Sequence, residues 1–169
     1  MRIFVIGYMG SGKSTVSHKL AEKLGYLRFD LDELFEQRYK ISIRDFFEKY
    51  DETLFRKLES RLLKETVLLN KVVISTGGGT PCFYDNMQWM MNYGITVLIE
   101  MHPNSLVKRL LESKKKRPLL KNKSQEQLKQ YVQNQLRQRN IWYSQAHIIL
   151  KGESINIDDA ARQIQGFLG

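Results

Sequence analysis

The fold of this chain is decided by the stretch Gly7-Tyr8-Met9-Gly10-Ser11-Gly12-Lys13-Ser14-Thr15. It matches G-x-x-x-x-G-K-[ST], the spacing of a phosphate-binding loop. The glycines let the backbone bend around a polyphosphate, so that successive N–H groups point at its oxygens. Lys13 can reach the outer phosphates, Ser14 can ligate Mg²⁺, and the helix that follows presents its positive end to the anion. The stretch therefore predicts a nucleotide site.

The segments on either side of this loop have the pattern that such a loop requires. The run Arg2-Ile3-Phe4-Val5-Ile6 is almost wholly apolar, which is typical of a strand buried on both faces. After the loop, Val16, Leu20 and Leu24 recur at helical spacing, and Gly25 predicts the end of that helix. A glycine-rich turn that only resembles the motif is the alternative, and the strand and helix around it disfavour that alternative.

Length and composition indicate one domain spanning residues 1–169. With 42% hydrophobic and 27% charged residues, the chain is ordinarily globular and long enough to bury a core. No apolar run approaches membrane-spanning length and no signal-peptide pattern precedes the first strand, so we expect no membrane association. The single cysteine, Cys82, cannot form an internal disulfide and favours a reducing cytoplasm. Cys82 could be a nucleophile, but a small buried hydrophobe beside Gly77–Gly79 is the favoured interpretation.

The positive charge of the chain is concentrated in one segment. A net charge of +9 at pH 7 could indicate a nucleic-acid partner. Eight basic residues and one acid lie between Lys108 and Lys123, however, and such a local cluster suits a lid that closes over an anion. We therefore expect a mobile lid at about residues 111–124 and no nucleic-acid partner. A solvated loop that keeps the protein soluble is the alternative explanation for Lys114–Lys116.

Further strands and helices alternate along the chain. Apolar runs predict strands at residues 26–29, 72–76, 95–100 and 147–150. Helical patterns predict helices at residues 34–39, 42–47, 51–69, 84–93, 103–111 and 124–143, and a terminal helix that Asp158 caps. This alternation predicts an α/β fold with an open, parallel, five-stranded sheet and helices on both faces.

Polar and flexible residues follow two of the predicted strands. Asp30 and Asp32 come directly after the strand at residues 26–29, where ligands bind in open α/β sheets. They could face the phosphates opposite Lys13, although either could instead be only the N-cap of the next helix. Gly77–Gly79 follow the next strand along the chain, and three glycines let a ligand approach the backbone closely.

Arg56 and Glu59 lie three residues apart on the predicted helix at residues 51–69, so their side chains can pair. Most pairs of this kind lie on the surface and contribute little to stability. Taken alone, the spacing favours such a surface ion pair.

A phosphate-binding loop by itself indicates a nucleotide but no reaction. The chain has no N-K-x-D sequence of the type that guanine-specific switches carry, which disfavours a signalling GTPase. It also has no second domain or repeat for a motor or transporter ATPase. What remains is room for one nucleotide and one small acceptor.

Taken together, the motifs resemble those of the shikimate kinase family over nearly the whole chain. The matching elements are G-x-x-G-x-G-K-S-T at Gly7–Thr15, D-x-D at Asp30–Asp32, F-R-x-x-E at Phe55–Glu59, G-G-G at Gly77–Gly79, R-P-L-L at Arg117–Leu120 and R-x-x-x-Y at Arg139–Tyr143. Only the first is specific by itself, whereas all six in this order are very specific. This family transfers the γ-phosphate of ATP to the 3-hydroxyl of shikimate, a step toward chorismate and the aromatic amino acids.

The resemblance implies roles for the residues around the nucleotide. Ser14 is implied to coordinate Mg²⁺, with Asp30 nearby, directly or through water. Arg117, on the lid, is implied to reach the transferring phosphate, and Arg109 to stack on the adenine. Phosphoryl transfer needs alignment and charge neutralisation more than covalent help, which agrees with these roles. The residues implied to hold the ATP phosphates are Gly10, Ser11, Gly12, Lys13, Ser14 and Thr15.

The resemblance also implies an acceptor site, centred on about residues 32–61. Asp32 is implied to bind the shikimate hydroxyls and to orient or deprotonate the attacking one, so that Lys13, Asp32 and Arg117 are the implied catalytic residues. Arg56 and Arg139 are implied to pair with the substrate carboxylate, because the planar guanidinium can bind both oxygens. Further substrate contacts are implied for Gly77, Gly78 and Gly79. In this context Glu59 holds Arg56 in position, which replaces the interpretation as a surface pair.

Two features of this chain depart from the family pattern. Many relatives have proline between the late arginine and tyrosine, whereas this chain has Asn140-Ile141-Trp142. Arg137 also lies two residues before Arg139, and on a helix the two side chains point in different directions, so only one reaches the substrate. The spacing to Tyr143 favours Arg139.

Three other functions are weighed against this one. A gluconate kinase or a nucleoside-monophosphate kinase would share the loop but need different acceptor-site arginines. A nucleic-acid-binding ATPase would use the overall positive charge, and a catalytically silent module would bind ATP without turnover. The favoured expectation is a cytoplasmic, monomeric, Mg²⁺-dependent enzyme with ATP and shikimate as its substrates.

Overall fold

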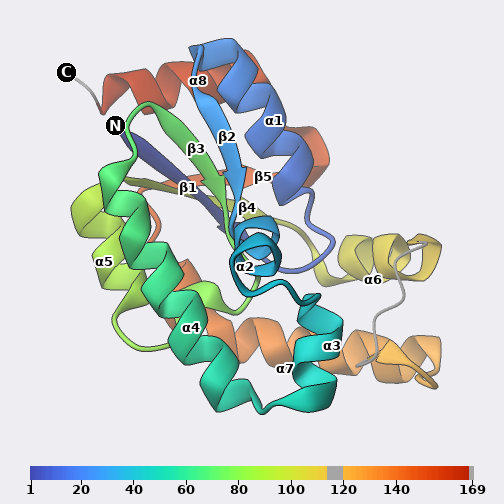
Figure 1. Ribbon diagram of the computed structural model, residues 1–169. Coiled ribbons are helices and arrows are strands. Elements are labelled where there is room, and N and C mark those ends of the chain that lie inside the picture. The colour runs from blue at the N-terminus through green and yellow to red at the C-terminus, as the bar shows by residue number, and fades with distance from the viewer. Residues whose placement is uncertain (114–119, 168–169) are drawn as a thin grey trace.

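The structure, a computed structural model, describes residues 1–113 and 120–167. Within these residues the chain forms a five-stranded sheet in the order β2-β3-β1-β4-β5, in which every neighbouring pair of strands is parallel (Figure 1). The strands are β1 (Arg2–Gly7), β2 (Leu27–Asp30), β3 (Val72–Ser75), β4 (Ile95–Glu100) and β5 (Ile148–Lys151). The predicted open parallel sheet is confirmed.

Helices connect the strands and cover both faces of the sheet (Figure 1). The helices are α1 (Lys13–Leu24), α2 (Leu31–Tyr39), α3 (Ile43–Lys49), α4 (Glu52–Glu65), α5 (Asn86–Tyr93), α6 (Pro103–Glu112), α7 (Gln125–Tyr143) and α8 (Ile157–Gly166). Helices α1 and α8 pack on one face, and α4, α5 and α7 pack on the other. Helix α6 leaves the carboxyl end of β4 and packs against α7.

Successive side chains of β1 enter two different cores. Ile3 and Val5 belong to the core under α1 and α8, while Phe4 and Ile6 belong to the larger core under α4, α5 and α7. All four side chains are fully buried. Burial on both faces explains why this strand is a continuous apolar run and does not alternate.

Helix α8 is capped by a different residue from the one predicted. The side chain of Asn156 accepts hydrogen bonds from the backbone N–H groups of Asp158 and Asp159. The prediction that Asp158 is the cap was therefore wrong by two residues. Asn and Asp cap helices about equally well, so residue type alone does not distinguish the two positions.

Other helix boundaries also differ from the sequence-based ones. Helix α2 begins at Leu31, not at residue 34, because the side chain of Asp30 caps it. Helix α5 begins at Asn86, two residues after Tyr84, whose φ of 51° is left-handed and incompatible with the helix. Helix α4 ends at Glu65, and a 3₁₀ turn replaces its last predicted residues.

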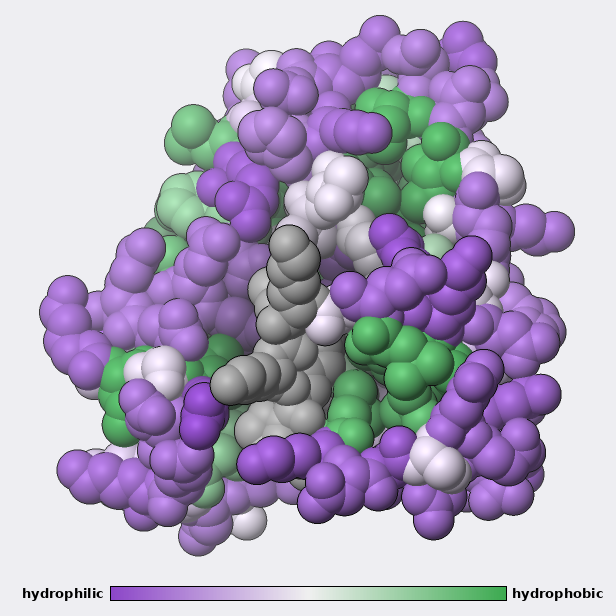
Figure 2. All heavy atoms as spheres, turned by 90° about the vertical axis from the view of Figure 1, so that its right-hand side faces the viewer, coloured by the Kyte–Doolittle hydropathy of each residue, from purple (hydrophilic) through white to green (hydrophobic). Residues whose placement is uncertain are grey.

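The side of the molecule that carries α6 and the start of α7 is shown in Figure 2. Polar and charged side chains cover most of this side, and apolar side chains gather in patches between them. The predicted lid, about residues 111–124, is described only in part. Residues 114–119, which include Arg117, lie outside the described residues. In the described part of the chain, no helix is long and apolar enough to cross a membrane.

Candidate active site

The phosphate loop joins the carboxyl end of β1 to the first turn of α1. Gly10 and Gly12 have φ angles of 79° and 93°, in the left-handed region that favours glycine. A Cβ on Gly7 would lie 2.7 Å from the carbonyl oxygen of Ile99, so this position leaves no room for a side chain. Gly12 is the N-cap of α1 and has no side chain that could cap the helix. The N–H groups of the first turn can therefore point at an anion.

The carbonyl oxygen of Tyr8 organises the inside of this loop. Lys13 Nζ donates a hydrogen bond to it over 3.0 Å, and the backbone N–H of Ser11 donates to it over 3.1 Å. The Ser11 side chain is buried, and its hydroxyl oxygen has no hydrogen-bond partner among the described residues. The loop is therefore shaped by its own backbone, and the ammonium group of Lys13 stays beside it.

Ser14 and Asp30 meet where α1 begins and β2 ends. Ser14 Oγ donates to Asp30 Oδ2 over 3.4 Å, while Asp30 Oδ1 caps α2, so the two carboxylate oxygens serve different partners. Among the described residues, no group of three or more His, Cys, Asp or Glu side chains could hold a metal alone. A hydroxyl and one carboxylate fit Mg²⁺, which takes its other ligands from water and phosphate.

Arg109 approaches the phosphate loop from α6. Its side chain is exposed, and a Cβ on Gly12 would lie 3.3 Å from Arg109 Nη1, which also donates to Met101 Sδ over 3.8 Å. Thr15 lies exposed in the first turn of α1. Arg109 and Thr15 thus both lie at the phosphate loop, whereas Arg117 lies outside the described residues.

Asp32, in the first turn of α2, lies beside another carboxylate. A Cβ on Gly77 would be 3.3 Å from Asp32 Oδ1 and 3.2 Å from Glu59 Oε2. Solvent reaches Asp32, yet the pKa of its carboxyl is raised to about 6, first because neighbouring protein displaces water and then because Asp30 and Glu59 are negative. The positive charge of Lys13 opposes this shift.

Arg56 and Glu59 form a buried ion pair on α4, not a surface pair. Arg56 Nη1 lies 3.0 Å from Glu59 Oε1, and the two side chains are 13% and 2% exposed. The Arg56 guanidinium also lies 4.3 Å from the centre of the Phe83 ring, and its Nε lies 3.2 Å from Glu52 Oε1. Burial raises the pKa of Glu59, while the charge of Arg56 and a hydrogen bond from Thr80 lower it.

Each of the three glycines after β3 makes room for a different group. The first borders the two carboxylates described above. A Cβ on Gly79 would lie 2.6 Å from Arg56 Nη2. A Cβ on Gly78 would lie 3.1 Å from Arg139 Nη1 and 3.3 Å from the backbone nitrogen of Met9. The phosphate loop, the glycine loop and Arg139 therefore converge at Gly78.

Helix α7 brings Arg139 to the glycines and leaves Arg137 exposed. The Arg139 guanidinium lies 5.2 Å from the centre of the Tyr8 ring. Tyr143, one turn further along α7, hydrogen-bonds Arg139, and its hydroxyl donates to the Gly78 carbonyl oxygen over 2.6 Å. Burial raises the pKa of Tyr143 to about 12, so it stays a donor. Of the two arginines, Arg139 therefore lies against the glycine loop and Arg137 does not.

Cys82 lies half-buried just after the glycines, less enclosed than predicted. Burial raises the pKa of its thiol to about 11, although the charges of Arg139 and Arg56 oppose the shift. At neutral pH the thiol is protonated, which disfavours a nucleophilic role.

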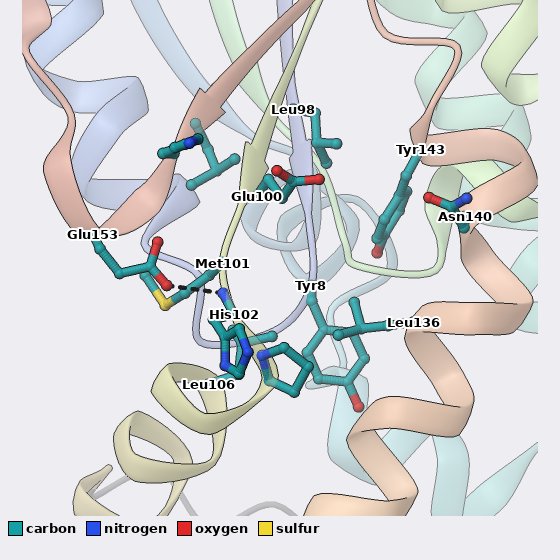
Figure 3. Close-up of a pocket in the computed structure, with 13 residues that line it drawn as sticks. Tyr8, Leu98, Glu100, Met101, His102, Leu106, Leu136, Asn140, Tyr143 and Glu153 are labelled. Carbon is teal, nitrogen blue, oxygen red and sulfur yellow. Dashed lines mark hydrogen bonds between the residues drawn. The ribbon is translucent and has the colours of Figure 1, made fainter.

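A cavity of about 510 Å³ adjoins this site (Figure 3). Tyr143 and Asn140 of α7 lie on one side of it, His102 lies on the other, and Tyr8 lies between them. The backbone N–H of His102 donates to Glu153 Oε1 over 2.8 Å at its edge. None of the predicted site residues that the structure describes lines this cavity, but Tyr8 and Tyr143 do, so the cavity borders the assembled site without including its predicted residues.

Some residues at the site have contacts that sequence analysis did not assign. Tyr8 occupies a variable position of the loop motif, and Tyr143 belongs to a motif but had no role. Thr80 and Phe83 had no signal beyond their position just after the glycines. Their contacts with Arg139 and with the Arg56–Glu59 pair depend on the tertiary fold.

Comparison with known proteins gives one consistent family. The family model described as "Shikimate kinase" matches residues 9–168. The shikimate kinase of Phocaeicola vulgatus is 41% identical over 164 residues, which cover 97% of this chain and 92% of that protein.

Solved structures agree with this comparison. A crystal structure of shikimate kinase from Bacteroides thetaiotaomicron matches with a TM-score of 0.91 and 38% identity, covering 99% of this chain and 98% of that one. The shikimate kinase from Acinetobacter baumannii in complex with shikimate matches with a TM-score of 0.85 and 30% identity, covering 99% of this chain and 92% of that one. A gluconokinase from Sinorhizobium meliloti matches with a TM-score of 0.64 and 18% identity, covering 99% of this chain and 91% of that one, and shares the fold alone.

Proposed function

This chain belongs to the shikimate kinase family, and from that premise we propose that it transfers the γ-phosphate of ATP to the 3-hydroxyl of shikimate. The products are shikimate 3-phosphate and ADP, and the reaction serves the biosynthesis of aromatic amino acids. The observation that carries the proposal is the convergence at Gly78. A Cβ added there would contact both Arg139 and the backbone of the phosphate loop. A kinase needs its phosphate donor and its acceptor site to adjoin in this way.

The nucleotide side of the site is proposed to work by charge neutralisation. Lys13 and the N–H groups of Gly10–Thr15 hold the phosphates, and Arg109 contacts the adenine. Ser14 and Asp30 would hold Mg²⁺, which when bound neutralises phosphate charge. Arg117 is proposed to contact the transferring phosphoryl group from the lid. These groups lower the barrier by stabilising the charge that develops on the phosphoryl oxygens.

The acceptor side is proposed to hold a carboxylic acid and to prepare its hydroxyl. Arg56 and Arg139 bind the carboxylate, and the glycine loop lets the ring approach the backbone. With a pKa of about 6, Asp32 is ionised at neutral pH and can accept the proton of the attacking hydroxyl. Whether Asp32 removes this proton or only accepts a hydrogen bond from the hydroxyl, it orients the hydroxyl oxygen toward the γ-phosphate.

We further propose a cytoplasmic enzyme that acts as a monomer. The residues proposed to bind the nucleotide and the acceptor include members of each sequence motif, and all of them belong to one chain. The sole cysteine, Cys82, suits a reducing compartment.

An ATP-consumption assay with Mg²⁺ and either shikimate, gluconate or AMP tests the function. We expect turnover with shikimate alone, because the family model and the relatives that match over nearly the whole chain are shikimate kinases, whereas the gluconokinase shares the fold alone. Turnover with gluconate or AMP but not with shikimate contradicts the proposal. Stimulation of ATP hydrolysis by DNA or RNA at low salt would instead favour the nucleic-acid-binding ATPase.

A further inference from the structure

A chain of buried hydrogen bonds runs behind the Arg56–Glu59 pair. Ser60 Oγ donates to Asn86 Oδ1 over 2.6 Å, and Asn86 Nδ2 donates to the Thr80 carbonyl oxygen over 2.9 Å. Thr80 Oγ1 then donates to Glu59 Oε2 over 2.7 Å. Thr80 and Asn86 are fully buried, and Ser60 is 6% exposed. The chain joins α4, the turn after the glycines, and the first residue of α5.

Both oxygens of the Glu59 carboxylate have a partner, and this chain of hydrogen bonds supplies the partner of one of them. Oε2 accepts from Thr80, and Oε1 faces Arg56 Nη1 at 3.0 Å. Glu59 is 2% exposed, so water does not offer alternative partners. A carboxylate held at both oxygens has one orientation, and the guanidinium paired with it takes its orientation from that carboxylate.

We propose that Thr80 and Asn86 are positioning residues that act through Glu59 to hold Arg56 in place for the acid group of the acceptor. The inference rests on the proposed function, in which Arg56 binds the acceptor carboxylate. Neither residue touches substrate in this account. Thr80 donates directly to Glu59, and Asn86 holds the backbone carbonyl of Thr80 in place.

The charges around Glu59 show why the hydroxyl of Thr80 matters. Arg56 and Glu52 face Glu59 from α4, Asp32 faces it from α2, and Cys82 from the turn after the glycines. Burial already favours the neutral form of Glu59, and the Thr80 hydrogen bond is one of the interactions that oppose it. Without that bond the pKa of Glu59 rises further, and a protonated Glu59 no longer attracts Arg56.

Thr80→Val removes the hydroxyl and keeps the shape of the side chain. We expect the KM for shikimate to rise about tenfold, because the lost hydrogen bond is to a charged group, while kcat changes less than about threefold. The ratio of KM between variant and wild type should be larger at pH 6 than at pH 8. Thr80→Ser restores a hydroxyl and should bring KM back to within about threefold of wild type.

Thr66→Val is the matched control. Thr66 is also a buried threonine, and its hydroxyl donates over 2.6 Å to the Leu63 carbonyl oxygen at the far end of α4. The Thr66→Val variant should have a lower unfolding temperature, as Thr80→Val should, but an unchanged KM for shikimate. If both variants lose stability and neither changes KM, Thr80 is structural only and the inference is overturned.

A double-mutant cycle separates action through Arg56 from any other effect. In an Arg56→Ala background, Thr80→Val should change the KM for shikimate by less than about twofold, because the group it positions is absent. A full tenfold effect in that background contradicts the inference. Wild-type enzyme inactive on shikimate would refute the proposed function itself, whereas active wild type with an unchanged Thr80→Val KM refutes only the positioning role.

Discussion

Tyr143 donates its hydroxyl hydrogen to the carbonyl oxygen of Gly78 over 2.6 Å, which ties the end of α7 to the loop after β3. Tyr143 also hydrogen-bonds Arg139. One buried side chain therefore connects the backbone of the glycine loop with the guanidinium proposed to bind the acceptor. The two residues are 65 positions apart in the sequence, so only the fold brings them together.

Tyr143→Phe removes this hydroxyl and leaves the ring in place. We expect the KM for shikimate to rise about fivefold to tenfold with a smaller change in kcat, because the Gly78 carbonyl loses its donor and Arg139 a partner. Steady-state kinetics with shikimate varied at saturating ATP measure this. The control is Tyr131→Phe, on the same helix, where the ring faces Lys123. An equal rise in that control would contradict the specific role of Tyr143.

The raised pKa of Asp32 predicts an acidic limb in the pH profile. Asp32 must be ionised to accept the hydroxyl proton, and with a pKa of about 6 its ionised fraction falls as the pH drops through that value. We expect kcat/KM for shikimate to fall about tenfold per pH unit below the limb. Asp32→Asn should lower kcat by about 100-fold or more and remove this limb. A limb that persists in Asp32→Asn would have to come from another group.

The same shift predicts that Asp32 weakens the fold at neutral pH. Its folded-state pKa of about 6 lies above the ordinary value of 3.8, so between these values the folded chain holds more protons than the unfolded one. Stability therefore falls as the pH rises through this window and stays lower above it. Because solvent reaches Asp32 and screens its neighbours' charges, we take this penalty as about 1 kcal/mol, so Asp32→Asn should raise the unfolding midpoint at pH 8 by roughly 2–4 °C in a domain of this size.

Thermal unfolding at pH 8 and pH 4.5 checks this sign. At pH 4.5 the gain should fall to roughly a third of its value at pH 8, because this pH lies close to the ordinary pKa of 3.8, below which the folded and unfolded carboxyls are both protonated. Glu33→Gln, an exposed carboxylate in the same turn of α2, should show no gain at either pH. A larger gain at pH 4.5 than at pH 8 would mean that the sign of the linkage is reversed.

Sequence reasoning succeeded where the signal was local. The loop motif, the apolar run of β1 and the stop at Gly25 each fix their structure within a few residues, and all are confirmed. It could not decide whether Arg56 and Glu59 are buried, since the spacing along a helix is the same on either face. It could not find Thr80 at all, because its partner Glu59 is 21 residues away in the sequence. Burial and long-range hydrogen bonds depend on how elements pack, which local patterns do not encode.

Arg139→Ala and Arg137→Ala form a matched pair on α7. Arg139 lies against the glycine loop, whereas Arg137 is exposed two residues away. We expect Arg139→Ala to raise the KM for shikimate by about 100-fold, since removing one partner of a charged pair costs roughly 3 kcal/mol, and Arg137→Ala to stay within about twofold of wild type. Shikimate titrations at fixed ATP measure both. A loss confined to Arg137→Ala would show that the other arginine binds the acceptor.

Gly78→Ala tests whether the phosphate loop and the acceptor site share one crowded point. The new Cβ would lie 3.1 Å from Arg139 Nη1, 3.3 Å from the Met9 nitrogen and 3.4 Å from the Gly7 carbonyl oxygen. Two of these three atoms are backbone atoms of the phosphate loop, which cannot move without changing the site that holds the phosphates. We therefore expect kcat/KM to fall about tenfold or more for both ATP and shikimate. Overpacking of this kind typically costs roughly 1–3 kcal/mol, which is enough for a fall of that size.

Gly25→Ala provides the contrast, because a Cβ there meets nothing within 4 Å but must adopt a left-handed φ of 67°. It should lower stability by about 1–2 kcal/mol through backbone strain and leave both values of kcat/KM unchanged. Measuring each substrate's kcat/KM together with the unfolding midpoint distinguishes the two glycines. If Gly78→Ala impaired shikimate alone and left ATP untouched, Gly78 would belong to the acceptor site only, and the donor and acceptor sites would not meet there.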